Sequence, residues 1–329
     1  MPSCASRSNP SDSTCSPWPR FTWADATKSS GSPAPRYSWS ATCWRAPTST
    51  CAVADKPRIA GVVVLYQPDL KRLAEALPTY APQLDVLYVF ANSPVAEFPI
   101  DTPRVEWIHS TDNVGIAAAL NSAAARALRE GCTWLLTMDQ DSHFTADGFA
   151  ELQRAIPLLP PRAALLGPDY LDQGRSAVRP RPVRLLIQSG TLVHLPTWQQ
   201  VGPFDEALFI DGVDHDYCLR AQAQGYGVFE WPQSRLNHAL GEIYPLPAWL
   251  FTFHRHSKRG IAFHKPYREY YEFRNNLWLI GRHGPKFPRW ALLRLGYLAL
   301  RLIYALSILP ERAERLRAIF RGIGAGLKK

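Results

Sequence analysis

Short apolar runs that alternate with segments of helical spacing fill residues 59–139 of this chain. The runs are rich in β-branched and aromatic residues, which is typical of strands buried on both faces of a sheet. The predicted strands are 59–65, 86–90, 105–109 and 133–138, and the predicted helices between them are 69–77 and 115–130. Strands that alternate with helices indicate an α/β fold with a doubly wound, mostly parallel sheet. Ligands of such sheets bind beyond the carboxyl ends of the strands, so we expect the functional site there.

The last of these strands ends in two carboxylates, at Asp139 and Asp141. If the strand continues to its tip, side chains at alternate positions point the same way and these two converge. Carboxylate oxygens with open positions for water and phosphate suit Mg²⁺ or Mn²⁺, and such an ion neutralises a leaving diphosphate. The alternative is a polar turn that caps a buried strand, and the spacing alone does not choose between them.

A second acidic cluster lies at the start of a predicted helix and contains Asp211, Asp214 and Asp216. One interpretation is structural, because Asp211 is a suitable N-cap and an acid three residues later suits the positive end of the helix dipole. The other is catalytic, since a carboxylate kept ionised by the same dipole accepts a proton from a substrate hydroxyl. One cluster that holds metal and a second that supplies a base would complete a group-transfer site.

The second half of the chain has a more mixed pattern and a basic end. Its predicted strands are 189–194 and 226–231, and its predicted helices are 213–224 and 267–281. The apolar segment 290–309 is interrupted by Arg294 and Arg301, so we expect an amphipathic helix at a membrane surface rather than a membrane-spanning one. On this model Trp290 and both arginines lie at the headgroups, and the membrane buries Leu292, Leu295, Leu298 and Leu302. A helix packed on the rest of the fold is the alternative.

The charge of the chain is concentrated at its ends. Residues 281–329 carry 11 Lys and Arg against 2 Asp and Glu, whereas residues 53–280 carry 21 against 24. The mildly acidic body argues against nucleic acid as a partner. The basic end favours an anionic surface such as a membrane. The cysteines lack the close pairs of a zinc site, and we expect a reducing compartment and no disulfides.

The first 55 residues are rich in Ser, Pro, Thr and Ala and show no helical or strand periodicity, so we predict disorder. They also lack the compact apolar run of a signal peptide. The patterned sequence begins near Val53, and a bacterial gene can start on a valine codon. We therefore interpret residues 1–52 as an extension from a misplaced start, with a genuine tail as the alternative.

Taken together, the motifs over residues 58–325 resemble those of the family 2 glycosyltransferases, most closely the rhamnosyltransferase branch. The most specific parts are residues 136–142 and 211–220. Further likenesses are residues 64–68, 113–117 with Asn121, 188–191, 201–206, 238–241 and 270–275. The resemblance implies a GT-A fold and inverting transfer of a sugar from a nucleotide donor. It also implies a nucleotide-binding half at 56–142, an acceptor half at 143–280 and basic C-terminal helices at 281–329.

The resemblance also implies roles for individual residues. Asp139 and Asp141, with His238, would hold Mg²⁺ or Mn²⁺, and Asp214 would deprotonate the acceptor hydroxyl. The residues expected to bind the nucleotide sugar are Leu65, Tyr66, Asn92, Asn113, Gly115, Asn121, Asp139 and Gln140. Those expected on the acceptor or phosphate side are Ser189, Gly190, Asp211, Arg274 and Asn275. A structural role is the alternative for His238, and helix packing is the alternative for Arg274 and Asn275.

One departure from the family pattern concerns the donor base. Family members usually carry Asp immediately before the Asn-Ser of the second strand, but this chain has Ala91 before Asn92. We expect transfer of L-rhamnose from dTDP-L-rhamnose to a surface polysaccharide or lipid-linked glycan, on the cytoplasmic face of the inner membrane. The alternatives are another nucleotide sugar, such as a UDP-sugar, and a catalytically silent carbohydrate-binding protein.

Overall fold

A computed structural model describes residues 56–145, 147–170, 177–237, 242–245, 260–263, 265–307 and 309–328. The predictions for residues 1–55 and for His238 lie outside them. The α-helices are α1 (Leu70–Ala76), α2 (Gly115–Arg129), α3 (Gly148–Ala155), α4 (Leu195–Val201), α5 (Val213–Ala223), α6 (Pro266–His283), α7 (Pro288–Ser307) and α8 (Arg312–Gly326). The strands are β1 (Ile59–Leu65), β2 (Val86–Ala91), β3 (Val105–His109), β4 (Trp134–Asp139), β5 (His143–Phe144), β6 (Ala163–Asp169), β7 (Arg181–Pro182), β8 (Thr191–His194), β9 (Gly227–Asn237), β10 (Glu242–Pro245) and β11 (Gly260–Phe263).

Most strands of the described residues join one large sheet in the order β3-β2-β1-β4-β8-β6-β9-β5, with β7 paired to β9. The first four strands are parallel, as are β6 and β9. Strand β8 runs antiparallel to both of its neighbours, β4 and β6. The prediction of a mostly parallel sheet with a mixed second half is therefore confirmed. The short pair β10 and β11 forms a separate antiparallel ribbon.

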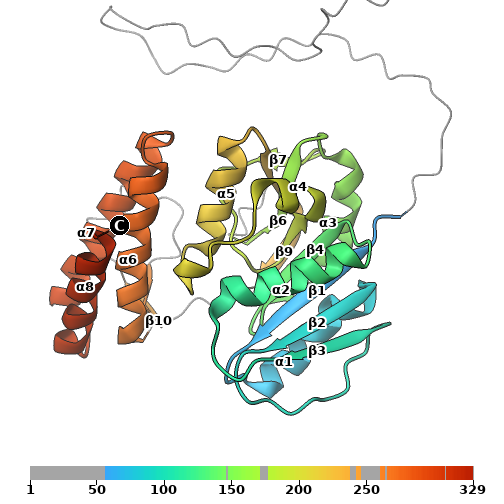
Figure 1. The fold of residues 1–329 in the computed structure, drawn as a ribbon, viewed down its shortest axis with the longest axis horizontal. Coiled ribbons are helices and arrows are strands. Elements are labelled where there is room, and N and C mark those ends of the chain that lie inside the picture. The colour runs from blue at the N-terminus through green and yellow to red at the C-terminus, as the bar shows by residue number, and fades with distance from the viewer. Residues whose placement is uncertain are drawn as a thin grey trace, which may run out of the picture. The chain divides into compact units, whose positions relative to one another are not determined.

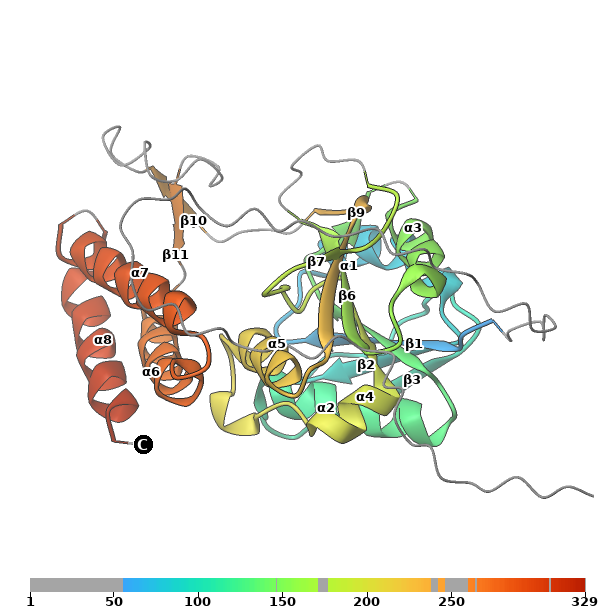
Figure 2. The ribbon, with the colours of Figure 1, turned by 90° about the horizontal axis from the view of Figure 1, so that it is seen from above.

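Alternate residues of β1 belong to two different hydrophobic cores, which explains why the whole strand is apolar. Ala60, Val62 and Val64 pack in the core that also contains residues of α2, α4 and α5. Ile59, Val63 and Leu65 pack in the core on the opposite face, with residues of α1 and α3. Figures 1 and 2 show α2 and α1 on opposite faces of the sheet. Helices thus cover both faces, as a doubly wound sheet requires.

The predicted elements of the first half agree with the structure to within a residue or two. The strand 59–65 is confirmed at both ends, and α2 ends as expected, because Gly131 adopts φ +77° just beyond it. Strand β6 was not predicted. Its sequence contains Gly167 and Pro168, which normally argue against a central strand.

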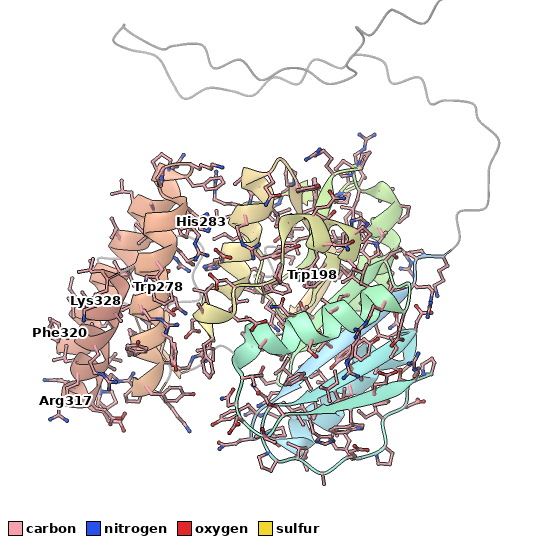
Figure 3. The ribbon with its side chains drawn as sticks, viewed as in Figure 1. Trp198, Trp278, His283, Arg317, Phe320 and Lys328 are labelled. Carbon is pink, nitrogen blue, oxygen red and sulfur yellow. The ribbon has the colours of Figure 1, made fainter. Side chains whose placement is uncertain are left out.

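Three C-terminal helices, α6, α7 and α8, pack together beside α5 (Figure 2). His283, near the end of α6, points toward α5 (Figure 3) and contacts Asp216 there. A small core between the three helices contains Phe273, Leu298 and Ile319.

The predicted helix at 290–309 is present as α7, and Leu292 and Leu295 are exposed as expected, but the placement of Trp290, Leu298 and Arg301 was wrong. Trp290 and Leu298 are buried against the protein. Arg301 is 3% exposed and pairs with Glu269 of α6, and Arg294 contacts His215 of α5. Both arginines therefore contact the protein, through His215 on α5 and the buried Glu269 on α6. The sequence of α7 alone does not reveal these partners.

Candidate active site

The carboxyl ends of β1, β2 and β4 lie side by side at one edge of the sheet. In the register of these parallel strands, Leu65 is paired with Ala91, and Val64 is paired with Asp139. The residues that follow each strand therefore gather at this edge, where ligands of doubly wound sheets bind. The predicted nucleotide residues Tyr66 and Asn92 lie here, and so does the acidic pair at the tip of β4.

The tip of β4 is a tight turn rather than a continuing strand. Strand β4 ends at Asp139, and the Ser142 amide donates to the Asp139 carbonyl at 3.4 Å. The expectation that strand alternation aligns Asp139 and Asp141 was thus wrong, and the two carboxylates instead lie on one turn. Ser189 supports this turn, because its Oγ accepts the Asp139 amide at 3.2 Å.

Gln140, between the two carboxylates, ties the turn to the end of β1. Its Oε1 accepts the Tyr66 amide at 2.8 Å, and its Nε2 donates to the Tyr66 carbonyl at 3.2 Å. An amide side chain that pairs with both backbone groups of one residue mimics the hydrogen bonding of a neighbouring β-strand. Gln140 thus holds Tyr66, whose side chain is 43% exposed, beside the acidic turn.

Asn92 and Asn113 form a polar network at the start of α2. Asn92 Nδ2 donates to Asn113 Oδ1 at 2.7 Å, and Asn92 Oδ1 accepts the Val114 amide at 2.9 Å. Asn113 Oδ1 also accepts the Gly115 amide at 3.1 Å. Both side chains are therefore engaged with protein in this structure, and they fix the loop that begins α2.

Gly115 is the point where α2 meets the segment that leads to the second acidic cluster. It adopts φ +80°, and a Cβ added there would lie 2.6–3.0 Å from atoms of Phe209. The Ile116 amide donates to the Phe209 carbonyl at 2.8 Å. Glycine is thus needed both for the left-handed conformation and for the close approach.

Asn121, predicted to bind the nucleotide sugar, contacts the same segment farther along α2. Its Nδ2 donates to the Phe204 carbonyl at 3.0 Å and to Glu206 Oε1 at 2.8 Å, and its Oδ1 accepts the Phe204 amide at 2.8 Å. These contacts give Asn121 a positioning role in this structure, on the loop before α5.

One interpretation of the second cluster made Asp211, its first acid, the N-cap of α5, and that interpretation was wrong. The N-cap is Gly212, with φ +85°, and no side chain caps the helix. Asp211 itself adopts φ +60° and pairs with Arg268 of α6 through both carboxylate oxygens. Burial lowers the pKa of the Arg268 guanidinium, but the charge of Asp211 outweighs burial and raises it. The carboxylate of Asp211 is thus already neutralised by an arginine.

Asp216, the third acid, is fully buried and holds α5 to α6. It accepts hydrogen bonds from Arg220 Nε at 2.7 Å, Arg282 Nη1 at 2.8 Å and His283 Nε2 at 2.9 Å. Burial alone would raise the pKa of this carboxyl, but these donors and their charge outweigh it and lower the pKa to about 2. Asp216 is therefore an ionised structural residue.

Asp214, the second acid, differs from its two neighbours, since no ion pair joins it to any described cation. It is half-buried, and its Oδ1 accepts the amide of the next residue, His215, at 2.8 Å. The Asp214 carboxylate can therefore accept a proton from a donor outside the protein.

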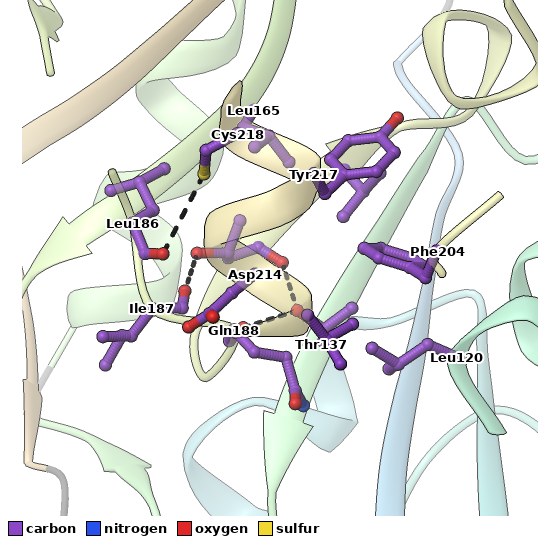
Figure 4. A pocket seen from close by; sticks show the side chains of 13 residues that line it. Leu120, Thr137, Leu165, Leu186, Ile187, Gln188, Phe204, Asp214, Tyr217 and Cys218 are labelled. Atoms are coloured by element: carbon purple, nitrogen blue, oxygen red, sulfur yellow. Dashed lines mark hydrogen bonds between the residues drawn. The ribbon is translucent and has the colours of Figure 1, made fainter. Parts of the chain in front are cut away.

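A pocket of about 290 Å³, solvent-open space included, lies at Asp214 (Figure 4). Its wall is largely apolar, and Asp214 is the one carboxylate among the described residues that line it. Thr137 also lines it and donates to the Gln188 carbonyl at 2.5 Å. Thr137 lies two residues before Asp139 on β4, so this pocket places Asp214 against the same strand that ends in the acidic turn.

His215, beside Asp214, accepts a hydrogen bond from the guanidinium of Arg294 on α7 at 2.6 Å to Nδ1. Burial lowers the pKa of this imidazole, so the ring is neutral. Because arginine only donates, the ring proton resides on Nε2. His215 is thus not a second charged group at the site.

Arg274 and Asn275 hold the segment before Asp211 from the side of α6. Arg274 Nη2 donates to the Ala207 carbonyl at 2.8 Å. Asn275 is fully buried, and its Nδ2 lies 2.6–2.8 Å from the carbonyls of Leu208, Ile210 and Asp211. These contacts favour the packing role over direct binding of acceptor or phosphate.

The acidic turn of β4 offers the oxygen ligands that Mg²⁺ and Mn²⁺ prefer. No group of three or more His, Cys, Asp or Glu side chains within the described residues could hold a metal ion. A cation held by Asp139 and Asp141 would need further ligands from outside the described residues, and carboxylate sites for Mg²⁺ commonly take such ligands from phosphate and water. His238, the third predicted ligand, lies outside the described residues.

The cations that pair with Asp211 and Asp216 were not predicted from the sequence. Arg268, Arg282 and His283 lie on α6, more than fifty residues after Asp211. A hint exists in the sequence, because buried acids need partners and α6 carries several basic residues. Without the fold, however, nothing pairs a given cation with a given acid.

Comparisons with known proteins identify a curated relative and solved structures that are similar to the chain. No protein-family model matches the chain. The dTDP-rhamnosyl transferase RfbF of Shigella flexneri is 27% identical over an alignment of 295 residues that covers 82% of this chain and 94% of that protein.

Two solved structures are also similar to the chain. GalNAc-T7 with UDP, GalNAc and Mn²⁺ matches at 11% identity and a TM-score of 0.47, over 56% of this chain and 44% of its own, less than half its length. S. aureus TarS 1–349 in complex with UDP-GlcNAc matches at 13% identity and a TM-score of 0.48, over 82% of this chain and 81% of its own.

The curated relative is matched over nearly its whole length. The chain is therefore similar, over most of its own length, to a protein named as a dTDP-rhamnosyl transferase.

Proposed function

We propose that the chain is a metal-dependent, inverting glycosyltransferase that moves L-rhamnose from dTDP-L-rhamnose to a hydroxyl of a surface polysaccharide or lipid-linked glycan. The observation that carries the proposal is the contrast within the second acidic cluster. Asp211 and Asp216 are neutralised by cations of α5 and α6, and Asp214 has no ion pair among the described residues. The curated relative named for dTDP-rhamnosyl transfer supports the choice of donor.

In this proposal Asp214 is the general base. Its carboxylate accepts the proton of the acceptor hydroxyl while the hydroxyl oxygen bonds to the anomeric carbon of the donor sugar. The bond from that carbon to the diphosphate oxygen breaks, and the nucleoside diphosphate leaves from the opposite face, so configuration inverts. The Gln140–Tyr66 contacts and the Asn92–Asn113 network would hold the nucleotide side of this cleft.

Asp139 and Asp141 would hold the divalent cation, which when bound neutralises the negative charge of the leaving diphosphate. Leu65, Tyr66, Ser189 and Gly190 would border the donor near this turn. Asp211, Arg274, Asn275 and Asn121 would act by positioning the segment that carries Asp214.

The competing proposal is that the donor is a different nucleotide sugar, and a specific observation supports it. Ala91, which stands where relatives usually carry Asp, is 1% exposed at the end of β2 and offers no carboxylate to a base. A panel of donors with Mn²⁺ separates the two. Release of dTDP from dTDP-L-rhamnose alone supports the proposal, and release of UDP from a UDP-sugar supports the alternative.

The role of Asp214 is tested by Asp214→Asn, with Glu75→Gln on the exposed side of α1 as the matched control. Loss of a general base lowers kcat by about 10²–10⁴-fold, whereas donor affinity, measured by calorimetry, should remain. The control should keep full turnover. Equal turnover by Asp214→Asn and the control would rule out this base, and no turnover by the unmodified protein with any donor would favour the silent carbohydrate-binding alternative.

A further inference from the structure

The outward face of α7 is apolar, whereas the two arginines in the body of the helix, Arg294 and Arg301, contact the protein. Leu292, Leu293 and Leu295 are 70%, 68% and 45% exposed, and Ile303 and Leu306 are 57% and 53% exposed. Positions 292, 295, 299, 303 and 306 recur at helical spacing, so they form one stripe. In a helix that packs on a soluble protein and faces water, the outward side is normally polar. We therefore expect this apolar stripe to contact a binding partner.

The inward face of α7 is held by polar contacts that fix the orientation of the stripe. Arg301 pairs with Glu269 at 2.7 Å, and Arg294 donates to His215 at 2.6 Å. Arg315 of α8 adds a second contact to Glu269 at 3.4 Å. Because buried ion pairs are costly to break from one side, α7 is held in this rotation.

Cations surround the apolar stripe. Lys286 and Arg289 are exposed at the start of α7, and Arg312 is exposed just beyond its end. On α8, Arg317 and Phe320 lie on the side away from α6 (Figure 3), with Phe320 60% exposed, and Lys328 is exposed just beyond the end of α8. Glu311 and Glu314 are the exposed acids of this part of the chain, and Glu311 is engaged with Arg315 at 3.9 Å. The surface thus combines apolar side chains with an excess of positive charge.

By length and composition α7 is also the one helix of the described residues that is apolar enough to cross a membrane. A third of its most apolar window, 33%, is buried inside the protein, however. Crossing would also break the contacts of Arg294 and Arg301 with α5 and α6 and place both charges in lipid. The geometry therefore favours a helix that lies along a surface.

We propose that the stripe of α7 and the exposed cations of α7 and α8 dock on the surface of an anionic lipid bilayer. Leucine and isoleucine side chains enter the headgroup boundary, and the arginines and lysines meet the lipid phosphates. A second copy of the chain is a poorer partner, because like positive charges would face each other across the contact. This proposal does not depend on the identity of the sugar donor.

The test is co-sedimentation of the full-length protein with vesicles that contain phosphatidylglycerol and with vesicles of phosphatidylcholine alone. We expect binding to the anionic vesicles that falls as salt is added. The double variant Leu292→Glu with Ile303→Glu should lose at least about tenfold in binding. The matched control, Leu70→Glu with Leu158→Glu, replaces two residues that are 56% and 50% exposed elsewhere and should bind like the unmodified protein.

Circular dichroism and donor turnover establish that both double variants are folded. Equal vesicle binding by the Leu292/Ile303 variant and the unmodified protein would overturn the proposal, and so would absence of binding to anionic vesicles. A dimer in light scattering that the same variant dissociates would assign the stripe to a second copy instead. Arg317→Glu with Arg321→Glu should weaken binding and reduce its salt dependence, because both side chains are exposed cations.

Discussion

The two acidic regions of this protein are built in opposite ways. The turn at the tip of β4 is held by local contacts of the sheet, from Gln140 to Tyr66 and from Ser189 to Asp139. The start of α5 is held by cations and amides that arrive from α6, far along the chain. The sheet thus shapes the nucleotide side, and the C-terminal helices shape the side that carries Asp214. Acids that look alike in sequence differ in role according to the cations that meet them.

The sharpest way to break the α5 side is Asp216→Ala. This change removes the buried carboxylate shared by Arg220, Arg282 and His283, and it leaves the buried His283 without that partner. Removing one partner of a buried ion pair costs about 3–5 kcal/mol, so we expect a loss of that size in urea denaturation. Asp147→Ala is the control, because Asp147 is exposed and its side chain makes no capping bond. A loss equal to that of the control would show that α6 does not depend on Asp216.

The contact between the two regions is tested by alanine at the two ends of α2. Gly115 and Gly131 have similar φ values, +80° and +77°. A Cβ added at Gly115 would lie against Phe209, whereas a Cβ added at Gly131 would meet one atom within 4 Å, Arg58 Nη1 at 3.6 Å. Gly131→Ala should cost about 1–2 kcal/mol for the left-handed conformation. Gly115→Ala should cost about 1–3 kcal/mol more, because Phe209 must move. Equal unfolding free energies for the two variants would contradict the close approach.

Acid should loosen the α5 side through Asp216. Its pKa, about 2 in the native state, lies below the ordinary value of 3.8, so the unfolded state binds the proton first as pH falls. The stabilisation is therefore complete above about pH 5 and is lost toward pH 2, and it amounts to roughly 2 kcal/mol. Urea midpoints measured across this range should fall less steeply for Asp216→Asn than for the unmodified protein. Parallel slopes would be evidence against this assignment.

The β4 side should respond least in stability and most in donor binding. Gln140→Ala removes two hydrogen bonds to the Tyr66 backbone, which is partly exposed to solvent. We expect about 1 kcal/mol of destabilisation and a several-fold higher KM for the donor with little change in kcat. Gln153→Ala, which removes one exposed contact to Gln83, is the control and should leave both values unchanged. An unchanged KM for Gln140→Ala would show that the turn does not border the donor.

Much of the fold could be predicted because buried parallel strands carry their own signal. The run Ile59–Leu65 is apolar throughout, since each face of the strand meets a different core, and its ends were predicted correctly. Strand β6 escaped because Gly167 and Pro168 interrupt its pattern. Asp139 and Asp141 stood out by position, but their alignment depended on a turn that the strand rule does not describe.

Less of the candidate site than of the fold could be predicted from the sequence. Asp214 is the acid of its cluster without a described ion pair, because Arg268, Arg282 and His283 pair with Asp211 and Asp216 instead. The packing of α6 on α5 sets the positions of these three cations. Such pairings are long-range and leave no local periodicity. Leu292 and Leu295 were placed correctly on the outward side of α7, but the contacts of Arg294 and Arg301 with the protein were missed, because their partners lie on other helices.

The contact of Gly115 with Phe209 has a consequence for motion. The Phe209 segment is fastened at one end to α2 and at the other to α6 through Arg274 and Asn275. These contacts oppose any displacement of that segment relative to either helix. Any hinge that admits or releases substrates would then lie outside this clamped stretch.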